Sequence, residues 1–298
     1  PRILALAAGY AVAFWPPLAV YSSAAFSTTF EVFAATWAVW LLFRAARSRR
    51  FSDAALAGVA YGAVGTMLPA FLGTLLFVPG ALLMMHVPWR RALGMSGAVL
   101  LVALLVLLPW TLRNARIHHR FIPVATNIGF NFLGGQIPEA GLTVNLLCYD
   151  DNVRWKRIDR RALETMNEAD FDRMLLVQGL EFARENPGLA ARRAMERLLC
   201  LWWGNPTLTG NVPGAGRAHM AVMAVVLLFF LIGLVTSFRF RDRFAIPYAV
   251  FLWHSLFYMN FAIRGRYAMP MYPLLLIVAV LGVGVLVRRR RLPDRTRG

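Results

Sequence analysis

Acidic residues are scarce in this chain, and most of them are confined to one stretch. Only 15 of the 298 residues are Asp or Glu, against 32 Lys or Arg, so the formal net charge is +17. Eleven of these acids lie between residues 111 and 217. In a soluble protein this balance would suggest a nucleic-acid partner. Here the arginines stand beside long apolar runs, so membrane topology explains them better, and no nucleic acid is expected to bind.

Several familiar sites are also missing. The sequence has no HExxH and no GxSxG, and the Gly134-Gly135 pair lacks the Lys and Ser/Thr of a phosphate-binding loop. His118 and His119 are adjacent, which is a poor arrangement for ligating one metal. A divalent cation at Asp150-Asp151 stays open as an alternative to a solvated turn, and no cofactor is otherwise indicated.

Cysteine is rare as well, which excludes a scaffold held together by several disulfides. The two cysteines, Cys148 and Cys200, both lie in the segment 111–217, which is expected on the extracytoplasmic side of the membrane, where a disulfide would persist. Cys200 lies in the apolar run LLCLWW, where a buried free thiol is the preferred reading.

Long uncharged runs dominate what remains. The chain is 58% hydrophobic with a mean hydropathy of +0.55. These values, together with the long uncharged runs, predict an all-α, polytopic transmembrane helix bundle. A helix needs about 20 apolar residues to cross the bilayer, and the runs are long enough to supply several such helices. We expect about eight spans, near 3–21, 28–43, 54–69, 70–88, 92–110, 218–238, 245–263 and 268–287.

Arginines between these spans predict the topology. The short loops 44–53, 89–91 and 239–243 are basic, and so is the tail from Arg288 to Arg291. The positive-inside rule places them in the cytoplasm, together with both chain ends. The sequence thus divides into spans one to five (1–110), an extracytoplasmic segment (111–217), and spans six to eight with a basic tail (218–298).

The extracytoplasmic segment is expected to be partly helical. Residues 120–150 are rich in Gly, Asn and Pro and predict irregular structure. Residues 168–185 predict a helix, and a second begins at Asn186-Pro187, with Asn as its N-cap. In this second helix Ala191, Ala194, Met195, Leu198, Leu199, Leu201 and Trp202 share one arc, and Arg192, Arg193, Glu196 and Arg197 lie opposite. It either lies in the membrane interface or packs its apolar arc on the bundle.

Two kinds of charged residue are candidates for function. Glu31 is the one carboxylate within the expected spans, and a charge in the bilayer costs about 2.5–3.5 kcal/mol on insertion scales. Arg264 and Arg266 open the last outer loop, and Arg113 and Arg116 leave another span on the same side. The forked guanidinium suits a lipid phosphate, although simple anchoring of helix ends is the competing interpretation. His254 and Asn260 are expected to make hydrogen bonds between helices.

Three motifs resemble a known family. They are P-W-x-x-R-N at 109–114 followed by NIGFNFLGG, the Asn186-Pro187 helix ending in Trp202-Trp203, and R-Y-x-x-P-x-x-P from Arg266 to Pro273. Together they resemble the bacterial relatives of the protein O-mannosyltransferases (glycosyltransferase family 39-like). This is the GT-C superfamily of polyprenyl-phosphate-sugar transferases, which includes the aminoarabinose transferases of lipid A.

The resemblance implies a multi-pass glycosyltransferase of the bacterial cytoplasmic membrane. It would move a sugar from a polyprenyl phosphate to a hydroxyl of a lipid, glycan or protein. The residues implied at the donor phosphate are Arg266, Arg264, Tyr267, Arg113 and Arg116, and those implied in the substrate pocket are Asn114 and Asn131.

The catalytic base is less clear from the resemblance. The acid that the family carries in its first outer loop is expected upstream of Pro1, because the chain shows no counterpart. The family often has Ser-Glu where this chain has Ser27-Thr28, so Glu31, one turn later, is the remaining candidate. A transporter of lipid-linked sugars and a non-catalytic membrane subunit are the alternative functions.

Overall fold

The computed structural model describes residues 2–23, 27–137, 165–203, 215–238, 241–262 and 265–290. These residues form helices and connections without a β-strand, which confirms the all-α prediction for the part described. The α-helices are α1 (Arg2–Ala13), α2 (Pro16–Ser23), α3 (Thr28–Ser48), α4 (Phe51–Met67), α5 (Val78–Met84), α6 (Trp89–His118), α7 (Ile128–Gln136), α9 (Glu168–Glu185), α10 (Pro187–Trp203), α11 (Ala215–Ser237), α12 (Arg241–Tyr258) and α13 (Tyr272–Arg290). Two 3₁₀ helices, η1 (Pro69–Phe77) and η6 (Gly265–Met271), precede α5 and α13.

Four helices are long and apolar enough to cross a membrane, within the ranges Thr28–Ser48, Trp89–His118, Ala218–Ser237 and Arg266–Gly284. A fifth arises if α1 and α2, bent by 46°, form one broken span. The bend falls at Pro16, where the expected first span is interrupted. Two further apolar stretches, Pro69–Met84 and Phe244–Tyr258, are shorter. The other spans of the expected eight remain predictions.

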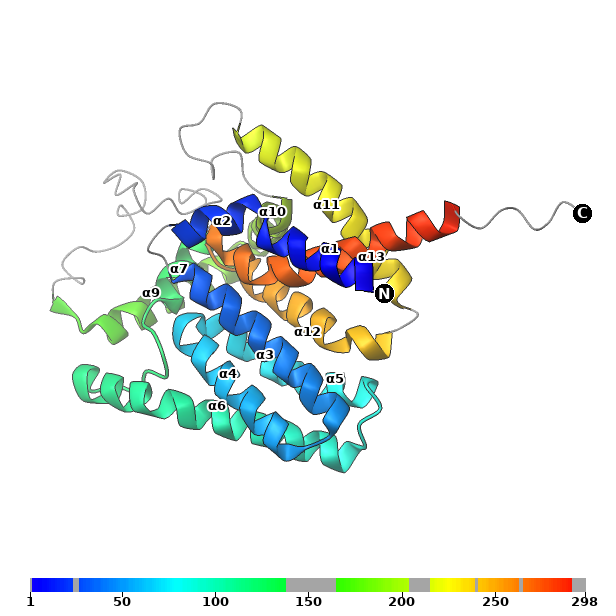
Figure 1. Cartoon of the computed structure of the whole chain (residues 1–298). Coiled ribbons are helices and arrows are strands. Elements are labelled where there is room, and N and C mark those ends of the chain that lie inside the picture. The colour runs from blue at the N-terminus through cyan, green and yellow to red at the C-terminus, as the bar shows by residue number, and fades with distance from the viewer. Residues whose placement is uncertain are drawn as a thin grey trace, which may run out of the picture.

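The helices pack in two groups (Figure 1). One contains α3, α4 and α6, and the other α1, α11 and α13. Helix α12 contacts η1, α5, α3 and α10, and α7 packs on α9. The large exposed side chains of α6 include Leu101, Leu104 and Leu105, all more than half exposed. Such an outer surface suits lipid rather than water.

Small residues allow the closest helix crossings. A Cβ on Gly62 of α4 would fall 2.5 Å from the Cβ of Val106 on α6. A Cβ on Gly282 of α13 would fall 2.1 Å from the carbonyl oxygen of Phe229 on α11. Membrane helices associate through such small residues because lipid gives no hydrophobic driving force between helices.

The long central segment follows the sequence in part. Helix α9 begins at Glu168, with the side chain of Asn167 accepting a hydrogen bond from the Ala169 amide, and α10 begins at Pro187, so both predicted helices are confirmed. The prediction of irregular structure over 120–150 is wrong for Ile128–Gln136, which forms α7. Glycines at the α7 contacts explain this helix, because a Cβ on Gly129 would collide with the Asp172 carbonyl of α9.

Asn186 only partly fulfils its expected role. Its carbonyl accepts a hydrogen bond from the Ala190 amide, as an N-cap carbonyl does. Its side chain, however, donates to the Phe182 carbonyl at 3.0 Å and so closes α9 rather than capping α10.

The orientation of α10 differs from the expected one. The arginines were expected opposite the apolar arc, yet Arg193 is 7% exposed and Arg197 has no exposed surface. Part of the arc packs on the bundle as one alternative expected, since Ala194 and Leu201 are buried. Met195 and Leu199 are instead 53% and 54% exposed, which fits the membrane-interface alternative.

Candidate functional site

A cavity of about 420 Å³ lies where the first turn of α3 meets the end of α12 and the start of η6. Two connections close it, one between α4 and η1 and the other between α6 and α7. Its lining residues are Glu31, Met67, Leu68, Pro69, Ala70, Leu72, Pro123, Val124, Ala125, Asn127, Ile128, Asn131, Phe257, Tyr258, Phe261, Arg266 and Tyr267. Four residues expected at a site from the sequence, Glu31, Asn131, Arg266 and Tyr267, are therefore brought together.

Glu31 supplies a carboxylate to this cavity. The residue is 6% exposed, and the Ser27 hydroxyl donates to its Oε1 at 2.6 Å. Position i+4 explains that contact, since Ser27 precedes α3 and Glu31 lies one turn into it. Within the described part of the chain, no arginine, lysine or histidine forms an ion pair with Glu31. The carboxylate thus keeps acceptor positions for a ligand.

Arg266 supplies the cation. It stacks at 5.9 Å from the ring centroid of Tyr267, and no acid of the described residues pairs with it. The Tyr258 hydroxyl lies within electrostatic range of both Glu31 and Arg266, and the Tyr21 hydroxyl within range of Arg266. The cavity therefore combines a buried carboxylate, an arginine fork and phenolic hydroxyls.

His254 fixes the segment that carries Arg266. Its Nε2 lies 2.7 Å from the Tyr267 carbonyl oxygen, and its side chain is 1% exposed. The expected contact of His254 between helices is thereby confirmed. The Asn260 amide instead donates to the Leu256 carbonyl of its own helix at 2.9 Å, so its expected role between helices is wrong.

Helix α7 closes the cavity on another side. The Ala262 amide donates to the Asn131 carbonyl at 2.9 Å, and the Gln136 side chain donates to the Asn260 carbonyl at 3.0 Å. Gly135 permits this approach, because a Cβ there would lie 2.4 Å from that same Asn260 oxygen. The Oδ1 of Asn131 is buried and has no hydrogen-bond partner among the described residues. An acceptor at the wall of the cavity is therefore left for a donor from outside the chain.

The other arginines lie elsewhere. Arg113 and Arg116 are exposed and do not line the cavity, and Arg113 stacks 4.9 Å from the Trp110 ring centroid. Asn114 is 4% exposed and donates to the Val124 carbonyl at 2.9 Å. It therefore holds the connection that forms a cavity wall rather than lining the cavity itself. Arg264 is outside the described residues.

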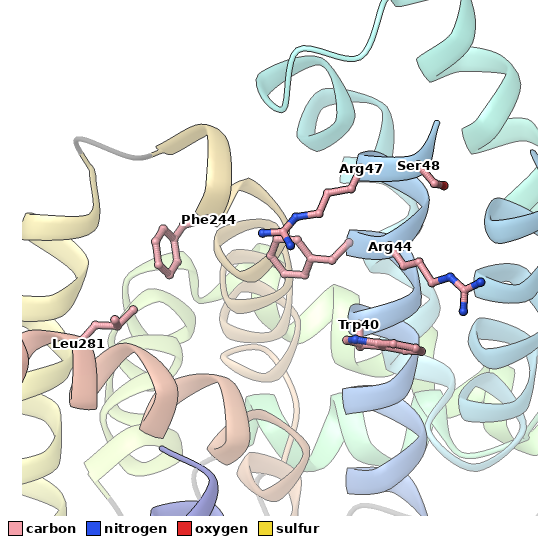
Figure 2. Close-up of a pocket in the computed structure, with 7 residues that line it drawn as sticks. Trp40, Arg44, Arg47, Ser48, Phe244 and Leu281 are labelled. Carbon is pink, nitrogen blue, oxygen red and sulfur yellow. The ribbon is translucent and has the colours of Figure 1, made fainter. Parts of the chain in front are cut away.

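A larger cavity, of about 920 Å³, lies at the opposite end of α3 (Figure 2). Its lining residues are Trp40, Phe43, Arg44, Arg47, Ser48, Phe244 and Leu281. Arg47 extends from α3 toward Phe244, whereas Arg44 points to the other side and pairs with Asp53 at 3.0 Å. The Ser48 hydroxyl also donates to Asp53. None of its described lining residues is acidic, and the Ser48 hydroxyl is already bonded to Asp53, so these residues supply no group for sugar transfer.

The cavity also contains residues that sequence reasoning missed. Tyr258 and the connection from Pro123 to Asn127 were not expected there, because only packing brings them beside Glu31. A polar tyrosine at the end of an apolar span was the available signal. In the described ranges no three His, Cys, Asp or Glu side chains gather as candidate metal ligands. The possible cation site at Asp150-Asp151 and the cysteine partner Cys148 lie outside those ranges.

Comparison with protein-family models, with curated proteins and with solved structures found no match to this chain. The resemblance to polyprenyl-phosphate-sugar transferases therefore rests on the quoted motifs and remains a prediction.

Proposed function

We propose that this protein is a multi-pass membrane glycosyltransferase that moves a sugar from a polyprenyl phosphate to an acceptor hydroxyl. One observation carries the proposal: the buried Glu31 and Arg266 line the same cavity. Neither residue has an ion-pair partner among the described residues. This chemistry requires two groups of the protein, a general base and a cation that binds the leaving phosphate. The eight-span topology, with the cavity at the extracytoplasmic face, belongs to the same proposal.

In the proposed reaction, the Glu31 carboxylate takes the proton of the acceptor hydroxyl. The acceptor oxygen then attacks the anomeric carbon, and the bond from that carbon to the phosphate oxygen breaks. The bonding electrons leave with the polyprenyl phosphate, whose growing negative charge Arg266 stabilises. Ser27, which donates to Glu31, orients the carboxylate, and Asn131 offers an acceptor for a sugar hydroxyl. No oxidant, reductant or metal is needed for the balance of this step.

The size and position of the cavity support this assignment. A volume of about 420 Å³ suits one small polar group such as a sugar. The cavity lies at the N-terminal end of α3, and Arg44 and Arg47 lie at its other end. Thirteen residues separate Glu31 from Arg44, which corresponds to about 20 Å of helix. The cavity is therefore far from the basic membrane face that is predicted to be cytoplasmic.

A transporter of lipid-linked sugars is the second candidate. The observation in its favour is the presence of cavities with arginines at both ends of α3. Between them, however, the helix is tightly packed: Ala38 has no exposed surface, and Leu42 is 1% exposed. A path for a sugar would need polar groups along this stretch. The packing therefore favours chemistry at one end over passage between the ends.

Binding of polyprenyl monophosphate to the purified protein tests the assignment of Arg266. Charge-assisted hydrogen bonds contribute about 1.5–3 kcal/mol each, and lysine keeps the charge but loses the fork. Arg266→Lys should then weaken binding about ten- to a hundredfold, since about 1.4 kcal/mol is a factor of ten. The control is Arg116→Lys, the same change on the predicted outer side but away from the cavity. Equal binding by the two variants would reduce Arg266 to a membrane anchor.

A further inference from the structure

The inward side of α10 carries two arginines one turn apart. The buried residues of this helix are Arg193, Ala194, Arg197 and Leu201. Positions i and i+4 on a helix share one face, so the two guanidinium groups lie on the same buried side. Ala194 and Leu201 are buried beside them, whereas Met195 and Leu199 are more than half exposed. Apolar packing alone does not explain why the helix buries two cations while it exposes these two apolar side chains.

The Arg197 guanidinium lacks hydrogen-bond partners among the described residues. Its Nε, Nη1 and Nη2 are all buried. Glu196, its neighbour in sequence, pairs instead with the exposed Arg192 at 2.9 Å. Burial and the charge of Arg193 lower the pKa of Arg197 to about 10, so the group still carries its charge at neutral pH. A buried charge without an ion pair is strongly unfavourable, and no acid of the described residues forms an ion pair with Arg197.

We propose that Arg197, with the positive charge of Arg193 one turn before it, forms an anion site that binds a phosphate group. The planar fork of a guanidinium matches two phosphate oxygens, and two cations one turn apart suit one such group. The exposed apolar side chains of α10 place the helix at the membrane interface, which is the depth of phospholipid headgroups. An anionic phospholipid and a soluble phosphate offer the same chemistry to this pair.

This site is separate from the cavity that contains Glu31. Neither arginine lines that cavity, and the charged neighbours of Arg197, which are Arg193 and Glu196, belong to its own helix. The proposal therefore does not depend on sugar transfer. Helix α10 contacts α7, α9, α11, α12 and η6, so an anion bound there would stabilise the contact between the interfacial helix and the bundle.

Thermal unfolding of the full chain in nanodiscs tests the proposal. The protein is first placed in zwitterionic phosphatidylcholine, and either inorganic phosphate is added or phosphatidylglycerol replaces part of the lipid. A ligand that binds only the folded state raises the Tm. We expect the wild-type Tm to rise in at least one arm. A rise with phosphatidylglycerol alone identifies a lipid headgroup, and a rise with inorganic phosphate identifies a soluble anion.

Three variants make the test specific. Arg197→Met, which removes the charge at similar length, should need at least tenfold more anion for the same rise in Tm. Without added anion it should be no less stable than the wild type, because an uncompensated charge has been removed. Arg197→Lys is used if Arg197→Met does not fold. The anion concentration that it needs for the same rise in Tm should lie between those of the wild type and Arg197→Met. Arg192→Met is the matched control on the exposed side and should keep the full response. No rise in the wild type, or equal losses in the Arg192 and Arg197 variants, would overturn the proposal.

Discussion

Gly282 lies where α11 and α13 cross, and the loss of stability caused by its substitution can be estimated from the structure. In Gly282→Ala, the new methyl carbon would lie 2.1 Å from the Phe229 carbonyl oxygen. An ordinary contact between carbon and oxygen is about 3.3–3.6 Å, so the two backbones must separate by about 1 Å. Overpacking of this kind costs about 1–3 kcal/mol. Replacing helical glycine by alanine also contributes about 1 kcal/mol in favour of folding, which hides part of the strain.

A second glycine removes that ambiguity. A Cβ on Gly97 of α6 would meet nothing within 4 Å, so Gly97→Ala carries the gain in helix propensity without the clash. The difference in the free energy of unfolding between Gly97→Ala and Gly282→Ala is then the strain energy, and it should be about 1–3 kcal/mol. Unfolding of both variants by SDS in mixed micelles measures these free energies. Equal stabilities would mean that the two helices do not cross at Gly282, and the packing described for α11 and α13 would be refuted.

Two further predictions concern charge and topology. Asp53 is 5% exposed and bonds to both Arg44 and Ser48, so Asp53→Ala should lower the free energy of unfolding by about 1–3 kcal/mol. Removal of the partly exposed Asp170, which pairs with the exposed Arg120, should leave the Tm unchanged. A larger loss of stability on removing Asp170 than on removing Asp53 would contradict the burial of Asp53. With the native cysteines replaced, a maleimide applied outside cells should label Cys introduced at position 160 but not at position 293, and the opposite pattern would invert the topology.

The sequence predicted the helices whose signals are local. Helix α9 begins at the expected Glu168, and α10 begins at the expected Pro187, because helix starts depend largely on neighbouring residues. Helix α7 was missed because glycine and asparagine disfavour helix in isolation. Its stability comes from contacts with α9 and with Asn260 in the turn after α12, which only the folded chain provides.

The candidate site was predictable as residues but not as an arrangement. Glu31 and Arg266 were identified separately, one as a charge within a span and the other from a motif. They line one cavity because α3 contacts η6, although Glu31 and Arg266 lie 235 positions apart in the chain. Arg113, Arg116 and Arg266 all adjoin the ends of expected spans and lie in or beside the motifs that resemble the family. Only the packing of the helices shows that Arg266 lines the cavity and that Arg113 and Arg116 do not. The face that α10 buries also depends on its neighbours, which an apolar arc does not reveal.

The most direct test of the central claim is sugar transfer by the complete protein with Glu31 changed to Gln. The amide keeps the size of the side chain and its contact with Ser27 but accepts no proton. Purified protein in nanodiscs would receive a polyprenyl-phosphate hexose and, separately, a polyprenyl-phosphate aminopentose. Release of polyprenyl phosphate would be followed with and without a mixture of lipid acceptors. We predict release by the wild type with at least one donor and a loss of about 10²–10⁴-fold in Glu31→Gln. Wild-type release rates in that variant, with polyprenyl phosphate still bound, would contradict the assignment of Glu31 as the base.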